Sequence, residues 1–262
     1  MEQVMNRTPA PSWSTVTEQE LTAAVERSAL QQHPFDHIYM ENIFDPESYS
    51  ALLEAMPDRR FYHELSHRDA MRTDGSSTRL RLYLYPELLW RLPADQRRVW
   101  MPIARALCSR KLQEAFKRKF RTVLEQRFGK PAERIGLYPV PILLRDQPGY
   151  RIGIHSDVKS KGITVQYYLP QDESQRDIGT VFHEGDVGEM AERTTPLPFM
   201  PATGYAFPVA LTKSWHSAPL TTEADGERVS MMVTYYVADR PDAWFLRRLR
   251  RAALLFGLRP RG

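Results

Sequence analysis

The second half of the chain, after Pro131, consists of short apolar runs separated by glycine, proline and aspartate. Runs of this length and spacing are typical of the strands of an all-β sandwich or barrel. The six expected strands cover residues 135–145, 150–155, 162–169, 178–183, 203–209 and 228–237.

In the first half of the chain, apolar residues recur at helical spacing instead. Thr17 and Glu20 form a capping box that predicts the start of one helix, and Asp45-Pro46 predicts another that ends near Met56. A short strand is expected at 37–40, irregular polar structure at 58–80 and a long helix at about 96–128. The predicted class is α+β with a mainly β core. A flexible terminus is expected at 1–14, followed by one domain over 15–262 that consists of helical support at 15–130, a β core at 135–238 and a final helix at 241–258.

Successive side chains of a strand point to opposite faces, so a strand with alternating polar and apolar residues has one face of each kind. Two of the expected strands have polar side chains gathered on one face. In 162–169, Thr164, Gln166 and Tyr168 share one face, while Ile163, Val165, Tyr167 and Leu169 share the other. In 228–237, one face carries Arg228, Ser230, Met232, Thr234 and Tyr236. An apolar outer face covered by helices and a polar inner face indicate a barrel that holds a polar ligand.

Composition narrows the possible classes of protein. Of the 262 residues, 42% are hydrophobic and 26% charged, which allows a sizeable core and excludes a disordered chain. The single cysteine, Cys108, excludes an intrachain disulfide framework and a cysteine-built metal site, and it favours a reducing, cytoplasmic location. No apolar run approaches the roughly twenty residues that a membrane-spanning helix requires.

The net charge of +4 is concentrated at the end of the chain, where residues 240–262 hold seven arginines and one aspartate. Because the rest is nearly neutral, a nucleic-acid partner is not expected. The final helix places Phe245, Leu249, Ala252 and Phe256 on one side and Arg247, Arg248, Arg250 and Arg251 on the other. Two interpretations remain open: its apolar side packs on the protein, or it makes peripheral contact with an anionic membrane. No pattern indicates a particular oligomeric state.

One group of residues has the composition of a metal site. His155 and Asp157 lie two apart on one strand face, and His216 follows 59 residues after Asp157, far enough to return on a later strand. Arg228 and Ser230 again share a strand face, and a guanidinium beside a hydroxyl suits recognition of a buried carboxylate.

This order of residues resembles the iron(II)- and 2-oxoglutarate-dependent dioxygenases, and most closely their prolyl-hydroxylase-like branch. The segments 163–170, 179–180 and 235–236, together with 34–38, strengthen the resemblance. It implies a double-stranded β-helix, or jelly roll, with the helical N-terminal half packed on its outer face. It also implies that His155, Asp157 and His216 bind Fe(II), and that Arg228, Ser230 and Tyr168 bind the cosubstrate 2-oxoglutarate. Molecular oxygen would be the second cosubstrate, with ascorbate in a supporting role.

The resemblance implies hydroxylation, or another oxidation, of an unactivated C–H bond with release of succinate and CO2, and Asp157 favours hydroxylation over halogenation. A small-molecule substrate is preferred, and Tyr150, Lys159 and Gln166 are candidates to contact it. One alternative is a hydroxylase of a protein side chain or of a carrier- or lipid-linked group. The other is a metal-binding β-barrel without oxygenase activity, which would not require the Arg228-x-Ser230 pair.

Overall fold

The computed structural model describes residues 13–65, 68–185 and 194–257, so most of the terminus predicted at 1–14 lies outside the described residues. The helices are α1 (Trp13–Arg27), α2 (Pro46–Glu54), α3 (Ala94–Leu107), α4 (Arg110–Lys119), α5 (Arg121–Phe128) and α6 (Pro241–Leu255). The strands are β1 (Ile38–Met40), β2 (His63–Glu64), β3 (Arg79–Tyr83), β4 (Leu137–Asp146), β5 (Ile152–His155), β6 (Lys161–Tyr168), β7 (Val181–His183), β8 (Thr194–Pro196), β9 (Gly204–Pro208), β10 (Trp215–Ala218) and β11 (Arg228–Val237).

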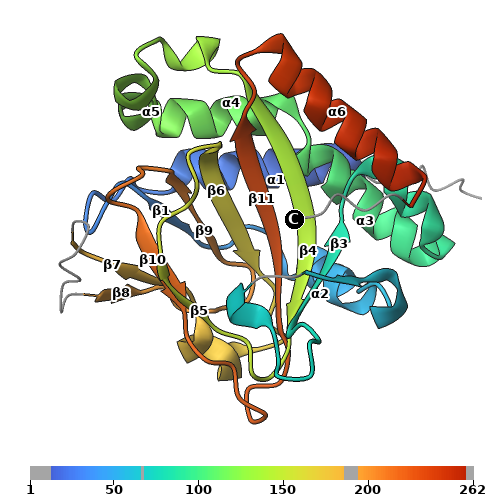
Figure 1. The fold of residues 1–262 in the computed structure, drawn as a ribbon. Helices are drawn as coiled ribbons and strands as arrows, with labels where there is room; N and C mark the ends of the chain where they lie inside the picture. The colour runs from blue at the N-terminus through green and yellow to red at the C-terminus, as the bar shows by residue number, and fades with distance from the viewer. Residues whose placement is uncertain (1–12, 66–67, 186–193, 258–262) are drawn as a thin grey trace, which may run out of the picture.

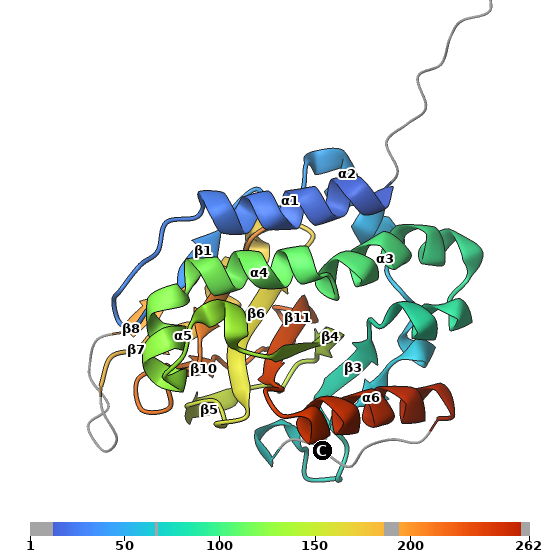
Figure 2. The same cartoon turned by 90° about the horizontal axis from the view of Figure 1, so that it is seen from above.

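The strands form two antiparallel sheets that build the jelly-roll core. The larger has the order β1-β9-β6-β11-β4-β3-β2 and the smaller the order β5-β10-β7-β8. Figures 1 and 2 show α1, α3 and α4 running across one face of the larger sheet, as the predicted helical support requires. Among the described residues, no helix is both long and apolar enough to cross a membrane.

Alternation along β6 and β11 decides what each face of the larger sheet meets. Ile163, Val165 and Tyr167 of β6 and Met231 and Val233 of β11 are fully buried in one cluster with residues of α1, α3 and α4. The opposite face of the same strands lines a cavity between the two sheets. The predicted barrel with an apolar outside and a polar inside is therefore confirmed.

Two predictions about helix ends are wrong. Helix α1 begins at Trp13, so Thr17 lies in its second turn rather than at its N-cap. Threonine is tolerated inside a helix, where its hydroxyl can bond to a backbone carbonyl of the preceding turn. The single helix expected at 96–128 is three helices. Ser109 starts α4 by accepting a hydrogen bond from the Leu112 N–H at 3.1 Å, and a second break at Phe120 keeps that ring buried. By contrast, Asp45 caps α2 with Pro46 at its start, as predicted.

The 58–80 stretch, expected to be irregular, contributes β2 and the start of β3, which extend the larger sheet. Leu80, Leu82 and Leu84 alternate with Arg79, Arg81 and Tyr83, a strand pattern that the expectation of irregular structure overlooked. Strand β3 pairs with β4 along its whole length, with Arg79 opposite Asp146 and Tyr83 opposite Ile142.

Helix α6 packs on the protein, but with the face opposite to the one expected. Arg251 forms an ion pair with Glu87, and the Arg247 guanidinium lies 3.9 Å from the centre of the Tyr236 ring. Phe245 is 56% exposed and Phe256 80% exposed. The interpretation that the apolar stripe covers the core is therefore wrong. The surface under α6 offers aromatic rings and a carboxylate, which a planar guanidinium contacts better than an alkyl group does.

Candidate functional site

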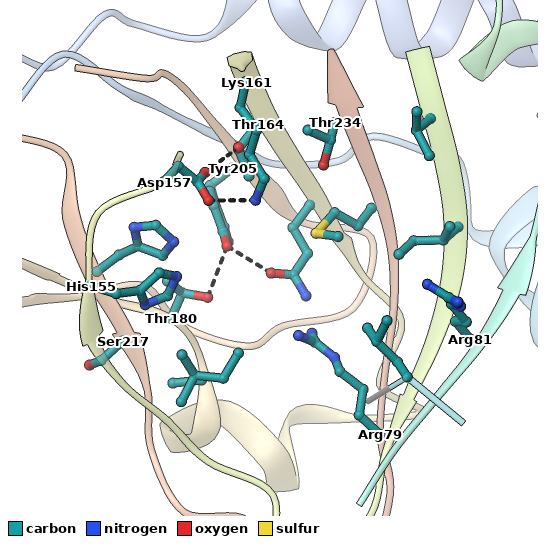
Figure 3. Close-up of a pocket in the computed structure, with 18 of the residues that line it drawn as sticks. Arg79, Arg81, His155, Asp157, Lys161, Thr164, Thr180, Tyr205, Ser217 and Thr234 are labelled. Atoms are coloured by element: carbon teal, nitrogen blue, oxygen red, sulfur yellow. Dashed lines mark hydrogen bonds and ion pairs between the residues drawn. The ribbon is translucent and has the colours of Figure 1, made fainter. Parts of the chain in front are cut away.

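The two sheets bring His155, Asp157 and His216 together at one side of the cavity, and Figure 3 shows His155 and Asp157 pointing into it. His155 on β5 and His216 on β10 are directly paired cross-strand neighbours, and their ring centres lie 4.2 Å apart. One ligand atom from each of the three residues lies within 4.8 Å of the others. Two imidazoles and a carboxylate at such separations are the facial triad that suits non-haem iron(II).

Backbone carbonyl groups set the orientation of both imidazoles. Nδ1 of His155 lies 3.0 Å from the Gly153 oxygen, and Nδ1 of His216 lies 3.0 Å from the Ser214 oxygen. Because a carbonyl oxygen only accepts, each Nδ1 carries a proton and donates it, and in the neutral form of the ring this leaves Nε2 unprotonated. Each ring therefore presents a lone pair to a metal ion, with its other nitrogen fixed in the way that metal-binding histidines usually are.

The protonation states of His216 and Asp157 also suit a metal ligand. Burial lowers the pKa of His216 to about 4, although the Asp157 charge opposes this, so the imidazole is neutral near pH 7. Burial by itself would raise the pKa of Asp157. The Lys161 charge, followed by His216 and hydrogen bonds, outweighs burial and holds that pKa below its usual value, so the carboxyl group is ionised.

Asp157 is held from two sides. One carboxylate oxygen accepts from the Lys161 ammonium, and the other accepts from the Thr164 hydroxyl at 2.6 Å. Lys161 and Thr164 both belong to β6, so the larger sheet orients a carboxylate that lies two residues beyond the end of β5 in the smaller sheet. Lys161 lines the cavity, whereas Lys159, the lysine expected to contact substrate, is exposed and lies outside the lining.

The cavity holds about 300 Å³. Behind its lining, the buried carboxylate of Asp146 lies between two arginines that do line it, Arg79 and Arg228, and we call this part of the cavity the closed end because all three residues are buried. Asp146 on β4 is the direct cross-strand partner of Arg79 on β3 and of Arg228 on β11. The Arg228 Nη1 lies 3.0 Å from one Asp146 oxygen, and the Arg79 Nε lies 2.8 Å from the other. Two guanidiniums and one carboxylate leave this end with one net positive charge.

Arg228 is 1% exposed and fixed by further contacts. Its Nε donates to the Ile178 carbonyl at 2.9 Å, and its guanidinium lies 4.8 Å from the Phe199 ring centre. Of its five N–H donors, the hydrogen bonds to Ile178, Asp146 and Thr180 use three, which leaves two for a ligand. Arg79 lines the same cavity, its guanidinium 4.8 Å from the Tyr150 ring centre. Arg228, the one arginine predicted to bind the cosubstrate, is therefore joined by a second arginine in the cavity lining.

A buried chain of hydrogen bonds continues from this end towards the triad. The Thr180 hydroxyl donates to the Tyr205 hydroxyl at 3.1 Å, and the Tyr205 hydroxyl donates to the Gln166 side-chain oxygen at 2.7 Å. The Gln166 amide in turn donates to the Ser230 hydroxyl at 2.7 Å. These contacts fix the rotamer of each member, so the wall of the cavity is rigid.

The predicted cosubstrate and substrate residues fall into two groups. Arg228, Gln166 and Tyr150 line the cavity. Ser230 and Tyr168 are fully buried and are not part of its lining: Ser230 orients Gln166, and the Tyr168 hydroxyl accepts the Thr180 N–H at 2.9 Å. Their predicted contacts with 2-oxoglutarate stay predictions, and in this structure they hold the residues that reach the cavity.

Sequence reasoning missed three residues of the site. Tyr205 lies in the predicted strand at 203–209, so it had a weak signal. Asp146 closes a predicted strand but had no recognisable motif. Arg79 lies in the stretch expected to be irregular, and only the pairing of β3 with β4 makes it part of the site.

No protein-family model and no curated protein matches this sequence. Solved structures do match the fold. A prolyl hydroxylase from Trichoplax adhaerens, solved in complex with a hypoxia inducible factor oxygen degradation domain peptide fragment, superposes with a TM-score of 0.55 at 9% identity, covering 87% of this chain and 94% of that one. A Pseudomonas putida prolyl-4-hydroxylase gives 0.51 at 13% identity, covering 83% and 99%. The chain therefore has the fold of these two prolyl hydroxylases.

Proposed function

We propose that this protein is a non-haem iron(II)- and 2-oxoglutarate-dependent dioxygenase that hydroxylates a C–H bond of a small-molecule substrate. The observation that carries the proposal is the cavity itself. A His-Asp-His triad at one side and a buried arginine pair with one net positive charge at the closed end face the same space of about 300 Å³.

The donor set fits the metal. The Nε2 atoms of His155 and His216 and a carboxylate oxygen of Asp157 would hold iron(II) and leave its other positions open. When bound, the iron supplies the oxidation of the substrate by O2, coupled to conversion of 2-oxoglutarate to succinate and CO2. Lys161 and Thr164 keep Asp157 ionised and oriented.

The arginine pair fits the distal carboxylate of the cosubstrate. Arg228 and Arg79 keep N–H donors beyond those that Asp146 accepts, and their net charge of one matches one carboxylate. Both are held by strand pairing and by aromatic rings, so little side-chain entropy is lost when the carboxylate binds. A simple metal-binding module would not require this second charged end.

Two measurements on the full-length protein test the proposal. Calorimetry under argon should show that 2-oxoglutarate binds the iron(II)-loaded protein and that binding weakens strongly without metal. With O2 and ascorbate added, succinate should be released, and candidate substrates should accelerate its release. Metal-independent binding, or no binding of 2-oxoglutarate at all, would contradict the proposal and favour a metal-binding module.

A further inference from the structure

A second cavity lies beneath α6 and adjoins the first. It holds about 260 Å³ between α6 and strands β3, β4 and β11. Arg81, Tyr83, Val140 and Tyr236 line both cavities, so the two are continuous along one wall. Figure 3 places Arg81 on the opposite side of the first cavity from His155 and Asp157. We call the space beneath α6 the α6 cleft.

The α6 cleft is lined by cations and contains no acidic residue among the described residues that line it. Its charged members are Arg81 from β3 and Arg247, Arg250 and Arg251 from α6. Only Arg251 has a carboxylate partner, Glu87. Within residues 13–65, 68–185 and 194–257, no carboxylate lies within ion-pair distance of Arg81, Arg247 or Arg250.

Two of these unpaired side chains are nevertheless held in place. The Arg81 guanidinium lies 5.1 Å from the Tyr83 ring centre, and that of Arg247 lies 3.9 Å from the Tyr236 ring centre. Stacking fixes the plane of a guanidinium while its N–H edge stays available to an acceptor. Arg247 is half-buried, and this burial lowers the pKa of its guanidinium.

Several like charges that line one cleft raise the local concentration of anions, and two of them here, Arg81 and Arg247, are half-buried while Arg250 is exposed. A bound anion would relieve their mutual repulsion and would accept the unused N–H donors in a bidentate manner. Three unpaired cations are better neutralised by a doubly charged oxyanion than by one carboxylate. The charge pattern therefore favours a phosphate group.

We propose that the α6 cleft binds a phosphate group of the substrate, so that the substrate of this enzyme is a phosphorylated small molecule. The choice of substrate class rests on the proposed function, whereas the anion site itself does not. The phosphate lies between Arg81 and Arg247, and the body of the molecule crosses the wall formed by Val140, Ile142 and Met232. The carbon to be oxidised then lies on the side of the triad.

The test uses phenyl phosphate as the probe and benzoate as its carboxylate counterpart, measured by calorimetry at low, constant ionic strength with the metal-free full-length protein. Phenyl phosphate should bind at least about tenfold more tightly than benzoate. Arg81→Gln and Arg250→Gln should each weaken phenyl phosphate binding about tenfold, which corresponds to one charge-assisted hydrogen bond. These two residues belong to different elements, so the test does not depend on Arg247, whose loss also removes a contact that seats α6.

The matched control is Arg248→Gln. Arg248 neighbours Arg247 on α6, is exposed and contacts the Trp244 ring instead of the cleft. Its substitution removes the same charge and should change binding less than twofold. An equal loss in Arg248→Gln would show general attraction to a basic helix and would overturn the proposal. So would equal affinity for benzoate, or no binding by the unaltered protein.

A further variant separates this site from the closed end of the first cavity. If Arg79→Gln abolishes phenyl phosphate binding while Arg81→Gln does not, the anion occupies the arginine pair around Asp146, and the α6 cleft is excluded. Because calorimetry on the metal-free protein requires no turnover, its outcome is independent of succinate release. The anion site therefore stands or fails separately from the oxygenase activity.

Discussion

Arginines occur at two places along the continuous cavity, and their surroundings differ. At the closed end, Arg79 and Arg228 share the carboxylate of Asp146, and all three residues are buried. In the α6 cleft, Arg81 and Arg247 are half-buried, stacked on tyrosines and without an acidic partner among the described residues.

This difference has a physical basis. A fully buried arginine must be compensated within the fold, because an unpaired charge in the interior costs several kcal/mol. A half-buried arginine is still partly solvated, so the fold tolerates it without a partner and a ligand can neutralise it. The closed end is therefore organised before any ligand binds, as suits a cosubstrate used in every turnover. The α6 cleft is incomplete until an anion arrives, as suits a site that selects a substrate.

The largest expected effect comes from substitutions in the triad, because the cosubstrate held at the closed end and the substrate held in the α6 cleft would both react there. His155→Ala or Asp157→Ala should reduce succinate release to background, because each removes one of three protein ligands. The fold should persist, because neither residue belongs to the main hydrophobic cluster. Circular dichroism and metal analysis accompany the assay, and full turnover by either variant with bound iron would refute the triad.

The next effect concerns the stability of the closed end. Asp146→Ala leaves Arg79 and Arg228 buried side by side without their shared carboxylate, and should cost about 3–5 kcal/mol in the free energy of unfolding. Arg81→Gln should change that free energy by less than about 0.5 kcal/mol, since no ion pair is lost. Urea denaturation measures both, and similar losses would remove the distinction between the two ends.

Cosubstrate affinity should follow the same division. Arg228→Ala should weaken 2-oxoglutarate binding by at least about a hundredfold, because it removes one partner of a buried charge pair. Arg81→Gln should alter that affinity less than about twofold, because Arg81 lies across the cavity from the triad and outside the Asp146 cluster. Calorimetry with iron(II) under argon decides the point. An unchanged affinity in Arg228→Ala would argue against this assignment of the closed end.

The smallest effect distinguishes the two faces of α6. Arg251→Ala removes the ion pair with Glu87 and the contact 4.3 Å from the Tyr85 ring centre, and should destabilise the protein by about 1 kcal/mol. Phe245→Ser, on the exposed face, should stay within about 0.5 kcal/mol of the unaltered protein. Urea titrations of both variants measure the two losses of unfolding free energy. A larger loss from Phe245→Ser than from Arg251→Ala would support the interpretation that the apolar side of α6 packs on the protein.

Much of the fold followed from local patterns. Alternation in 162–169 predicted which side chains of β6 enter the core and which face the cavity, because residue spacing alone assigns the two faces of a strand. Asp45-Pro46 predicted the start of α2, because capping depends on adjacent residues. Helix boundaries within 96–128 could not be predicted in this way, since the apolar stripe continues across the breaks at Ser109 and Phe120.

The sequence by itself predicted which three residues form the candidate metal site, since His155-x-Asp157, His216 and Arg228-x-Ser230 occur in a recognisable order, and the structure brings those three together. Only the tertiary structure decided the partners of the charges. Residues 79, 146 and 228 are distant in sequence, and the pairing of β4 with both β3 and β11 brings them together. The orientation of α6 was decided in the same way. An amphipathic helix has two faces, and the tyrosines and Glu87 beneath it, not the helix itself, determined that Arg247 and Arg251 face inward.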